Sequence, residues 1–383
     1  MKNFFKILII NICVLALLLV LADIFIGIIY KNNSAVPISS RYIQLREYPP
    51  NIDKNIETIL ENGKKMNSSI KTDLNGFIAG PNSTYEYSNI DIAFLGGSTT
   101  ENYFISPNFR FPYLVEEKIK QNFDSNFKII NAGVSGSSIA NTNLILYSKI
   151  IDLKPSHVFV MHNVNDLVLL SKTMSYWDAP SGRAIILDRS EEKNSTFKIS
   201  AYSILKWIKD NFFSNIYRIF KKYLEIDDKF FARNMGGLGD EFSDYRNNFF
   251  LSDPAKLKII ETYFKNGLNT FINICKANGI QPVLMTQPNR IENKSKFFMN
   301  EFKKWGYNES QLDIFSRAYT RFNQIILEIA NENEVHYIDL NAKVPQTDKY
   351  IYDSVHLSNE GSTLASDIIF NFISEILFNF ESR

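Results

Sequence analysis

From about residue 90 to the end of the chain, short apolar runs alternate with longer amphipathic stretches. The short runs are apolar on both faces of a strand, which is typical of strands that are covered on both sides. Strands that alternate with helices predict a parallel sheet with helices on both faces, so we expect a three-layer α/β/α domain over residues 89–383. The expected strands are IDIAFLG, FKIINAG, HVFVMHN, IQPVLMTQP and VHYIDL.

Residues 7–30 form a single apolar run that is broken only by Asn11 and Asp23. As a helix this run would be roughly 36 Å long, enough to cross a bilayer core. A cleaved signal peptide is the alternative, but its apolar region is usually shorter and no A-x-A cleavage pattern follows here. We expect an uncleaved single-pass anchor. The flanking charges modestly favour residues 1–6 on the cytoplasmic side, with the rest of the protein outside, at a bacterial inner membrane.

Two segments depart from the alternation of strands and helices. Residues 31–88 are polar and rich in turns, which predicts a stalk that leads into the domain. Residues 167–253 form an aromatic-rich insertion that contains a basic amphipathic stretch at 197–226. Such a helix can lie on a membrane surface or cover an acyl-binding cleft, and it can equally pack as a helical hairpin on the main domain.

Composition narrows the function classes. The chain has 383 residues, with 42 Lys and Arg against 41 Asp and Glu, so it lacks the basic surplus expected of a nucleic-acid-binding protein. Cys13 and Cys275 cannot form a disulfide framework, and the four histidines are scattered without metal-ligand spacing. We therefore expect no nucleic-acid partner, no metal and no other cofactor.

Four candidate groups follow predicted strands, at the edge where open α/β sheets bind ligands. Ser98 lies in a Gly-Gly-Ser turn after the first strand, and Gly136 lies in a glycine-containing loop after the second. Asn165 follows the third strand, where its amide could donate to an oxyanion. Asp353 precedes His356 by three residues, a spacing that lets a carboxylate orient an imidazole. Each motif alone is also typical of an ordinary turn, so the prediction depends on all four occurring at one sheet edge.

Other polar residues near this edge allow two interpretations. Gln287 and Arg290 end the fourth predicted strand and could contact a substrate, but helix capping or loop packing fits them equally well. His162 lies near Asn165, where a single histidine at a strand end is more often structural.

The four motifs together resemble the blocks of the SGNH/GDSL hydrolase superfamily, in order and after the expected strands. The matching residues are Gly-Gly-Ser98-Thr, Gly136, Asn165 within Asn-Val-Asn-Asp, and Asp353-x-x-His356, and the resemblance covers roughly residues 89–382. Asn75-Gly76-Phe77 with the Gly-Gly-Ser turn also resembles a membrane-anchored branch that acts near envelope glycans. The chain departs from the family pattern at Gly97, where the family has Asp, at Thr99, where it has Leu, and at Asn163, where it has Gly.

The resemblance implies a flavodoxin-like parallel sheet and a serine esterase mechanism. Ser98 would be the nucleophile, His356 the general base and Asp353 the residue that orients it. The Ser98 and Gly136 amides and the Asn165 side chain would form the oxyanion hole. We expect hydrolysis of a short acyl ester such as acetyl on an envelope or exported glycan.

Three other functions remain open from the sequence. An O-acyltransferase would use the same covalent intermediate, with a separate membrane protein as acyl donor and a cell-surface polysaccharide as acceptor. A lipid esterase or thioesterase would be favoured if the insertion at 167–253 were a lid at the bilayer. A glycan-binding scaffold without activity would keep the fold but not the chemistry.

Overall fold

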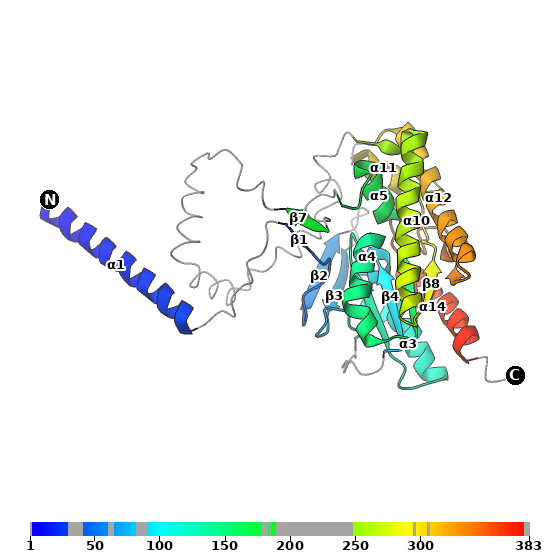
Figure 1. Ribbon diagram of the computed structural model, residues 1–383, viewed down its shortest axis with the longest axis horizontal. Helices are drawn as coiled ribbons and strands as arrows, with labels where there is room; N and C mark the ends of the chain where they lie inside the picture. The colour runs from blue at the N-terminus through cyan, green and yellow to red at the C-terminus, as the bar shows by residue number, and fades with distance from the viewer. Residues whose placement is uncertain are drawn as a thin grey trace. The chain divides into compact units, whose positions relative to one another are not determined.

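The computed structural model describes residues 2–29, 41–59, 65–81, 90–177, 183, 185–188, 248–293, 296–304 and 307–378. The chain divides into two compact units. One comprises Met1–Ile43 with Ile186–Gly236, and the other comprises Gln44–Ile185 with Gly237–Arg383. All candidate functional residues lie in the second unit, and Figure 1 labels many of its helices and strands.

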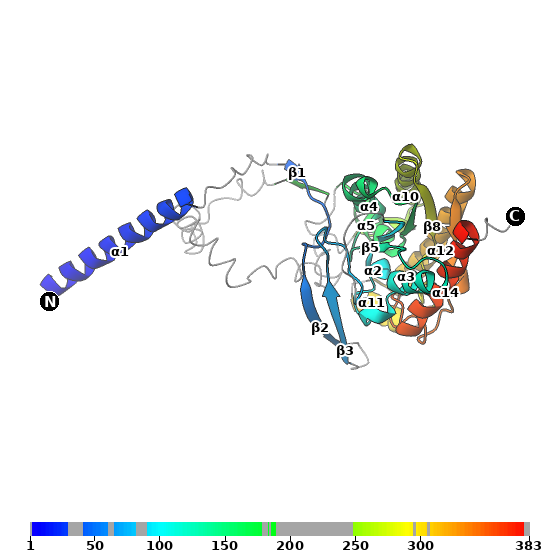
Figure 2. The ribbon, with the colours of Figure 1, turned by 90° about the horizontal axis from the view of Figure 1, so that it is seen from below.

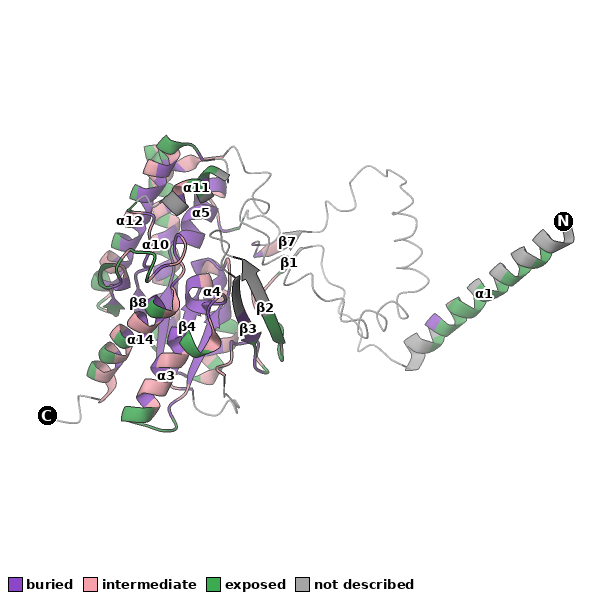
Figure 3. Ribbon diagram, turned by 180° about the vertical axis from the view of Figure 1, so that it is seen from behind, coloured by how far each residue is buried: buried purple, intermediate pink, exposed green. Residues whose placement is uncertain are grey.

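The first unit contains the N-terminal helix and a short strand pair. Helix α1 runs without interruption over Lys2–Ile29, and β1 (Arg41–Ile43) pairs antiparallel with β7 (Ile186–Asp188). Figure 3 shows most of the described side chains of α1 as exposed. The apolar run at residues 7–30 therefore falls on one continuous helix, and its crossing of a membrane stays a prediction.

The second unit is built on a five-stranded parallel sheet. Its strands are β4 (Ile92–Gly96), β5 (Ile129–Gly133), β6 (His157–Met161), β8 (Gln281–Met285) and β9 (His336–Ile338). They lie in the order β5-β4-β6-β8-β9, and every neighbouring pair is parallel. This is the flavodoxin-like order, so the predicted fold class is confirmed.

Helices cover both faces of the sheet, because the strands are apolar on both faces. Figure 2 shows α3 (Phe111–Asn122) and α14 (Asn359–Ile373) on one side, and α4 (Ile139–Ile145) and α10 (Pro254–Ala277) on the other. On the first side, Phe94 of β4 meets Phe111 edge-on at a ring distance of 5.4 Å. Helices α5 (Val164–Thr173) and α12 (Glu309–Glu332) also pack against α10.

Shorter elements complete the unit. They are β2 (Asp53–Ile59), β3 (Lys65–Lys71), α2 (Ser98–Glu101), α11 (Lys296–Lys304) and α13 (Leu340–Lys343), together with short 3-10 or π turns at Pro107–Phe109, Leu146–Ile150, Ile151–Leu153, Phe250–Ser252 and Ser374–Phe378.

One helical stretch among the described residues, Asn359–Phe378, has the length and apolar composition of a membrane span. It comprises α14 and the π turn that follows. Its residues Ala365, Ile369 and Ile373 are fully buried in the hydrophobic core of the domain. We assign it to the interior of the domain for that reason.

The domain that contains the five-stranded sheet begins earlier in the chain than the predicted boundary at residue 89. Within the expected stalk at 31–88, residues from Gln44 onward belong to the second unit. Strands β2 and β3 form an antiparallel hairpin, and Ile70 is fully buried. The Ile78 N–H donates to the Asn131 carbonyl of β5 at 2.9 Å. The stalk prediction was wrong for the described residues of 44–81, because Tyr48, Ile70, Phe77 and Ile78, which follow no period in the sequence, are buried in the second unit.

The predicted insertion at 167–253 overlaps α5, which belongs to the main domain and ends at Thr173. Its basic amphipathic stretch at 197–226 lies outside the described residues.

Candidate active site

The candidate residues lie at the carboxyl edge of the sheet. Ser98 begins α2 directly after β4, and Gly136 lies in the loop between β5 and α4. Asn165 lies in the first turn of α5, directly after β6. Asp353 and His356 lie in the loop between α13 and α14. The parallel order therefore gathers four loops that are far apart in the sequence at one edge.

Ser98, His356 and Asp353 form a continuous hydrogen-bonded chain. His356 Nε2 lies 2.7 Å from Ser98 Oγ. On its other side, His356 Nδ1 lies 2.6 Å from Asp353 Oδ2. The imidazole and the carboxylate side chains are 20% and 17% exposed, so both are sheltered but reachable from solvent. This is the geometry of a nucleophile, a general base and an orienting carboxylate.

The loop around Asp353 keeps its carboxylate ionised. Asp353 Oδ1 accepts hydrogen bonds from the Val355 N–H at 2.8 Å and the His356 N–H at 2.7 Å. Burial raises the pKa of Asp353, but the adjacent His356 and these two amides outweigh it, so the pKa lies below its ordinary value. An ionised carboxylate here fixes the Nδ1 proton of His356 and leaves Nε2 free to accept from Ser98.

The glycines before the nucleophile are required by close contacts. Gly96 has φ +156°, and a Cβ there would lie 2.3 Å from Thr100 Oγ1. A Cβ on Gly97 would lie 2.3 Å from Asn165 Nδ2. The side-chain amide of Asn165 thus occupies the space beside the turn.

The oxyanion donors predicted from the sequence are the backbone N–H groups of Ser98 and Gly136 and the side-chain amide of Asn165. The Asn165 amide donates one proton to the Ser137 carbonyl at 3.0 Å, which orients the group and leaves its second proton unused in this bond. Gly136 has φ +74°, a conformation that favours glycine. Within the described part of the chain, the backbone N–H groups of Ser98 and Gly136 have no acceptor.

Two aromatic rings flank the imidazole of His356. Tyr352 stacks on it at 5.8 Å between ring centroids, with an interplanar angle of 15°. Phe104 meets it edge-on at 6.3 Å. Both rings are half-buried, so they restrict the imidazole and offer an apolar surface beside the nucleophile.

A buried carboxylate lies one helical turn after the nucleophile. Glu101 is fully buried and accepts hydrogen bonds from the hydroxyls of Tyr48 and Ser135. Burial raises the pKa of Glu101 to about 7, despite the opposing effects of the Ser135 bond and of nearby positive charge. Arg46 donates from Nε to the Ser135 carbonyl at 2.7 Å, and its guanidinium lies against Gly136.

The cluster around Glu101 was not predicted from the sequence. Its Arg46 and Tyr48 come from the segment predicted as a stalk, where neither a motif nor a period marks them. Glu101 follows Ser98 by three residues, and this spacing is a signal in the sequence that could have indicated it.

Gln287 and Arg290 bond to the segments that carry Ser98, Asn165 and His356. Gln287 is 2% exposed, donates from Nε2 to Thr99 Oγ1 at 3.0 Å, and accepts from the Val164 N–H at 2.9 Å. The backbone N–H of Arg290 donates to the Ser354 carbonyl at 2.8 Å, and its Nη1 donates to the Ile351 carbonyl at 3.1 Å.

His162 lies inside the domain, away from the Ser98 chain. Its Nε2 is 2.7 Å from Thr142 Oγ1, and its Nδ1 is 3.2 Å from Asp166 Oδ2. Asp166 in turn accepts from the Ile139 N–H and the Tyr176 hydroxyl. His162 and Asp166 are 3% and 0% exposed, which agrees with a structural role.

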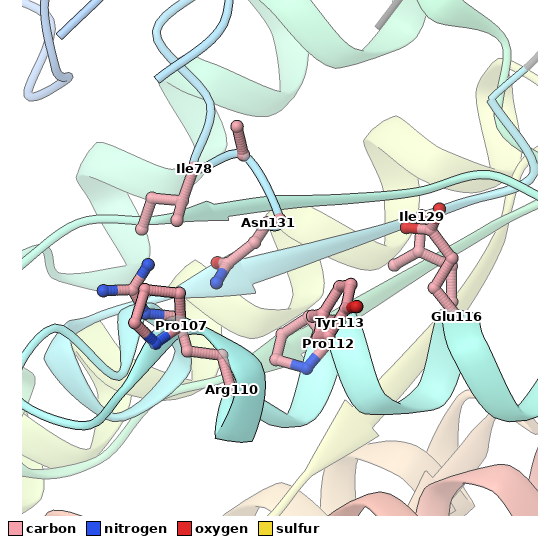
Figure 4. A pocket seen from close by; sticks show the side chains of 10 residues that line it. Ile78, Pro107, Arg110, Pro112, Tyr113, Glu116, Ile129 and Asn131 are labelled. Atoms are coloured by element: carbon pink, nitrogen blue, oxygen red, sulfur yellow. The ribbon is translucent and has the colours of Figure 1, made fainter. Parts of the chain in front are cut away.

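A small hollow lies beside α3, and no residue of the Ser98 chain lines it. Its volume is about 10 Å³, which is room for one water molecule. Figure 4 shows the side chains of Arg110 and Asn131 beside it. Arg110 braces this region by donating from Nε to the Asn102 carbonyl at 3.1 Å. The hollow is too small for an organic substrate. The bond from Arg110 beside it holds the residue that directly follows helix α2.

No protein-family model and no curated protein matches the chain. Several solved structures share low similarity with it. A GDSL-like lipase from Bacteroides thetaiotaomicron is 14% identical, with 75% of this chain and 89% of that chain covered and a TM-score of 0.38. The acetylxylan esterase Axe2 from Geobacillus stearothermophilus is 13% identical, with 76% and 95% covered and a TM-score of 0.40. A putative lipolytic protein of the G-D-S-L family from Desulfitobacterium hafniense is 10% identical, with 74% and 99% covered and a TM-score of 0.39. At these identities and scores, the likenesses establish neither a family nor an activity for this chain.

Proposed function

We propose that this protein is a serine esterase of the SGNH/GDSL type. The single observation that carries the proposal is the hydrogen-bonded chain from Ser98 through His356 to Asp353, with distances of 2.7 and 2.6 Å on the two sides of the imidazole. The Asn165 amide, which lies beside Gly97 directly before Ser98, supports a role for this residue as an oxyanion donor.

In the proposed reaction, Ser98 Oγ attacks the carbonyl carbon of an ester while its proton passes to His356 Nε2. Asp353 stabilises the imidazolium that forms. The tetrahedral intermediate collapses, the carbon–oxygen bond to the alcohol breaks, and His356 returns the proton to that alcohol. Water then attacks the acyl-serine in the same way and releases the carboxylic acid, with Ser98 reprotonated by His356.

The Ser98 and Gly136 N–H groups and the Asn165 amide bind the oxygen as it gains negative charge. Because these donors are already oriented, for example by the Asn165 bond to the Ser137 carbonyl, they stabilise the transition state without reorganisation. The positive charge of Arg46 against Gly136 favours an anion at the same place.

We further propose a short acyl ester on an envelope or exported glycan as the substrate, and attachment to a membrane through α1. The exposed apolar side chains of α1 support the attachment. The half-buried rings of Tyr352 and Phe104 beside His356 support an alcohol with an apolar face, such as a sugar ring. The resemblance of the Gly-Gly-Ser turn to anchored glycan-modifying enzymes agrees with this choice.

The test uses the full-length protein in detergent, with Ser98→Ala as the matched variant. Both are assayed on p-nitrophenyl acetate, on a longer-chain ester and on acetylated glycans, and both are incubated with a fluorophosphonate. Labelling and acetate release by the wild type alone would support the proposal. Efficient labelling with hydrolysis only after a sugar acceptor is added would favour acyl transfer. A folded wild type that neither labels nor hydrolyses would refute it.

A further inference from the structure

The loop that follows β8 bonds to the segments that carry Ser98, Asn165 and the Asp353–His356 pair. Gln287 in this loop bonds to Thr99, the residue after the nucleophile, and to Val164, the residue before the oxyanion donor Asn165. Arg290 bonds to the loop that carries Asp353 and His356. These contacts join chain segments that are separated by more than 60 residues.

Both ends of the Gln287 side-chain amide, the NH2 group and the oxygen, are engaged by these two bonds. Its Nε2 donates to Thr99 Oγ1 at 3.0 Å, and its Oε1 accepts from the Val164 N–H at 2.9 Å. The side chain is 2% exposed, so it does not reach a substrate. A planar amide with a donor on one side and an acceptor on the other fixes the separation of the two groups that it bridges.

The backbone of Gln287 is held just as firmly. Its N–H donates to Asn323 Oδ1 at 3.1 Å, and its carbonyl accepts from Asn323 Nδ2 at 3.1 Å. The Tyr319 hydroxyl also donates to this carbonyl, at 3.3 Å. Asn323 and Tyr319 lie on the long helix α12, so the bridge is anchored to a rigid element of the domain.

We propose that Gln287 is a positioning residue that sets the distance between the nucleophile turn and the Asn165 donor, through its paired bonds to Thr99 and the Val164 amide. The proposal rests on the esterase function above. The Ser98 hydroxyl and the Asn165 amide must both reach one substrate carbonyl, and a misplacement of about 1 Å can cost about 100-fold in rate. Gln287 bonds directly beside each of them.

Arg290 extends the same function to the third segment. Its two bonds fix the Ile351 and Ser354 carbonyls, which flank Asp353. The β8 loop therefore fastens the His356 loop as well as the nucleophile and the oxyanion donor. This accounts for both residues that the sequence left open between substrate contact and loop packing.

The experiment compares Thr99→Val with Thr99→Ser in the full-length protein. Valine keeps the shape of threonine but removes the oxygen that Gln287 Nε2 bonds to, whereas serine keeps that oxygen. We expect kcat on p-nitrophenyl acetate to fall about 10- to 100-fold for Thr99→Val, with KM nearly unchanged, and to recover in Thr99→Ser. The rate of fluorophosphonate labelling at Ser98 should fall in parallel.

Gln287→Met provides the second variant and Gln281→Met its control, because Gln281 is an exposed glutamine at the amino end of the same strand. We expect Gln287→Met to match or exceed the loss in Thr99→Val, and the double variant to lose no more than Gln287→Met, since both changes break one bridge. Gln281→Met should keep wild-type kcat. If Gln287→Met does not fold, the comparison of Thr99→Val with Thr99→Ser still tests the proposal.

Wild-type kcat in folded Thr99→Val would overturn the proposal, as would a lower melting temperature with unchanged kcat, which is the pattern of a purely structural bond. These outcomes differ from failure of the esterase function itself. In that case the wild-type protein would be inactive, and no comparison of variants would arise.

Discussion

The carboxyl and amino edges of the five-stranded sheet differ in how far their polar side chains are buried and hydrogen-bonded. At the carboxyl edge, polar side chains such as Glu101, Asn163 and Gln287 are at most 2% exposed and bonded to one another or to backbone. At the amino edge, open loops around Asp91 and Lys154 line a wide hollow of about 730 Å³. Burial of polar groups costs free energy unless each finds a partner, so a buried polar network marks the end of the sheet where geometry must be held. The larger hollow is therefore not the better indicator of the active site.

The largest expected effect is at the general base. His356→Ala removes the group that takes the Ser98 proton, and we expect kcat to fall about 10⁶-fold, as in serine hydrolases of other folds. The melting temperature should change little, because the imidazole is partly exposed. Steady-state kinetics beside thermal unfolding measure both. A fall of less than about 10-fold would mean that His356 is not the base.

A smaller but still large effect is expected at the oxyanion donor. Asn165→Ala removes one donor and should lower kcat by about 10²–10³ with little change in KM. Asn165→Asp is the matched variant, since it keeps the shape but places a negative charge beside the oxyanion. Equal activity of wild type and both variants would exclude Asn165 from the hole.

Substitution of one glycine at each edge of the sheet tests the difference between the two edges. Gly97→Ala places a Cβ 2.3 Å from Asn165 Nδ2, so the donor must move, and we expect kcat to fall about 10- to 100-fold. Gly279 at the amino edge has φ +70° with no atom within 4 Å of an added Cβ. Gly279→Ala should cost about 1 kcal/mol of stability through backbone strain and leave kcat unchanged. A loss of activity in Gly279→Ala would break the distinction between the two edges.

At Glu101 we expect a pH dependence of stability. Burial raises its pKa from 4.5 to about 7 in the folded state, so folding binds a proton between these values. The stability that this group contributes is fully present below pH 4.5 and is lost as the pH rises to about 7. Relative to wild type, Glu101→Gln should therefore gain up to about 3 kcal/mol in free energy of unfolding over that window. Denaturant titrations at several pH values measure it, and parallel curves for the two proteins would refute the raised pKa.

The strands and the triad were predictable for one physical reason. Strands covered on both faces are continuous apolar runs, and polar motifs directly after them must meet at the carboxyl edge of a parallel sheet. Ser98 and Asn165 follow such apolar runs, and His356 lies in a loop marked by the Asp353-x-x-His356 motif. That allowed their convergence to be predicted without coordinates.

The supporting groups were not predictable, because their partners are distant in the sequence and no period links them. Gln287 bonds to Thr99 across 188 positions, and nothing near Gln287 in the sequence indicates that partner. Tyr48 reaches Glu101 from a segment that reads as a polar stalk. Long-range polar bonds depend on the final packing of the helices, which local patterns do not specify.

The most direct test of the central claim is to identify the residue that a fluorophosphonate labels in the full-length protein. Peptide mapping by mass spectrometry should find the adduct on Ser98, at a rate that falls sharply in His356→Ala and with no adduct in Ser98→Ala. An adduct on another residue, or equal labelling of wild type and Ser98→Ala, would contradict the assignment of Ser98 as the nucleophile.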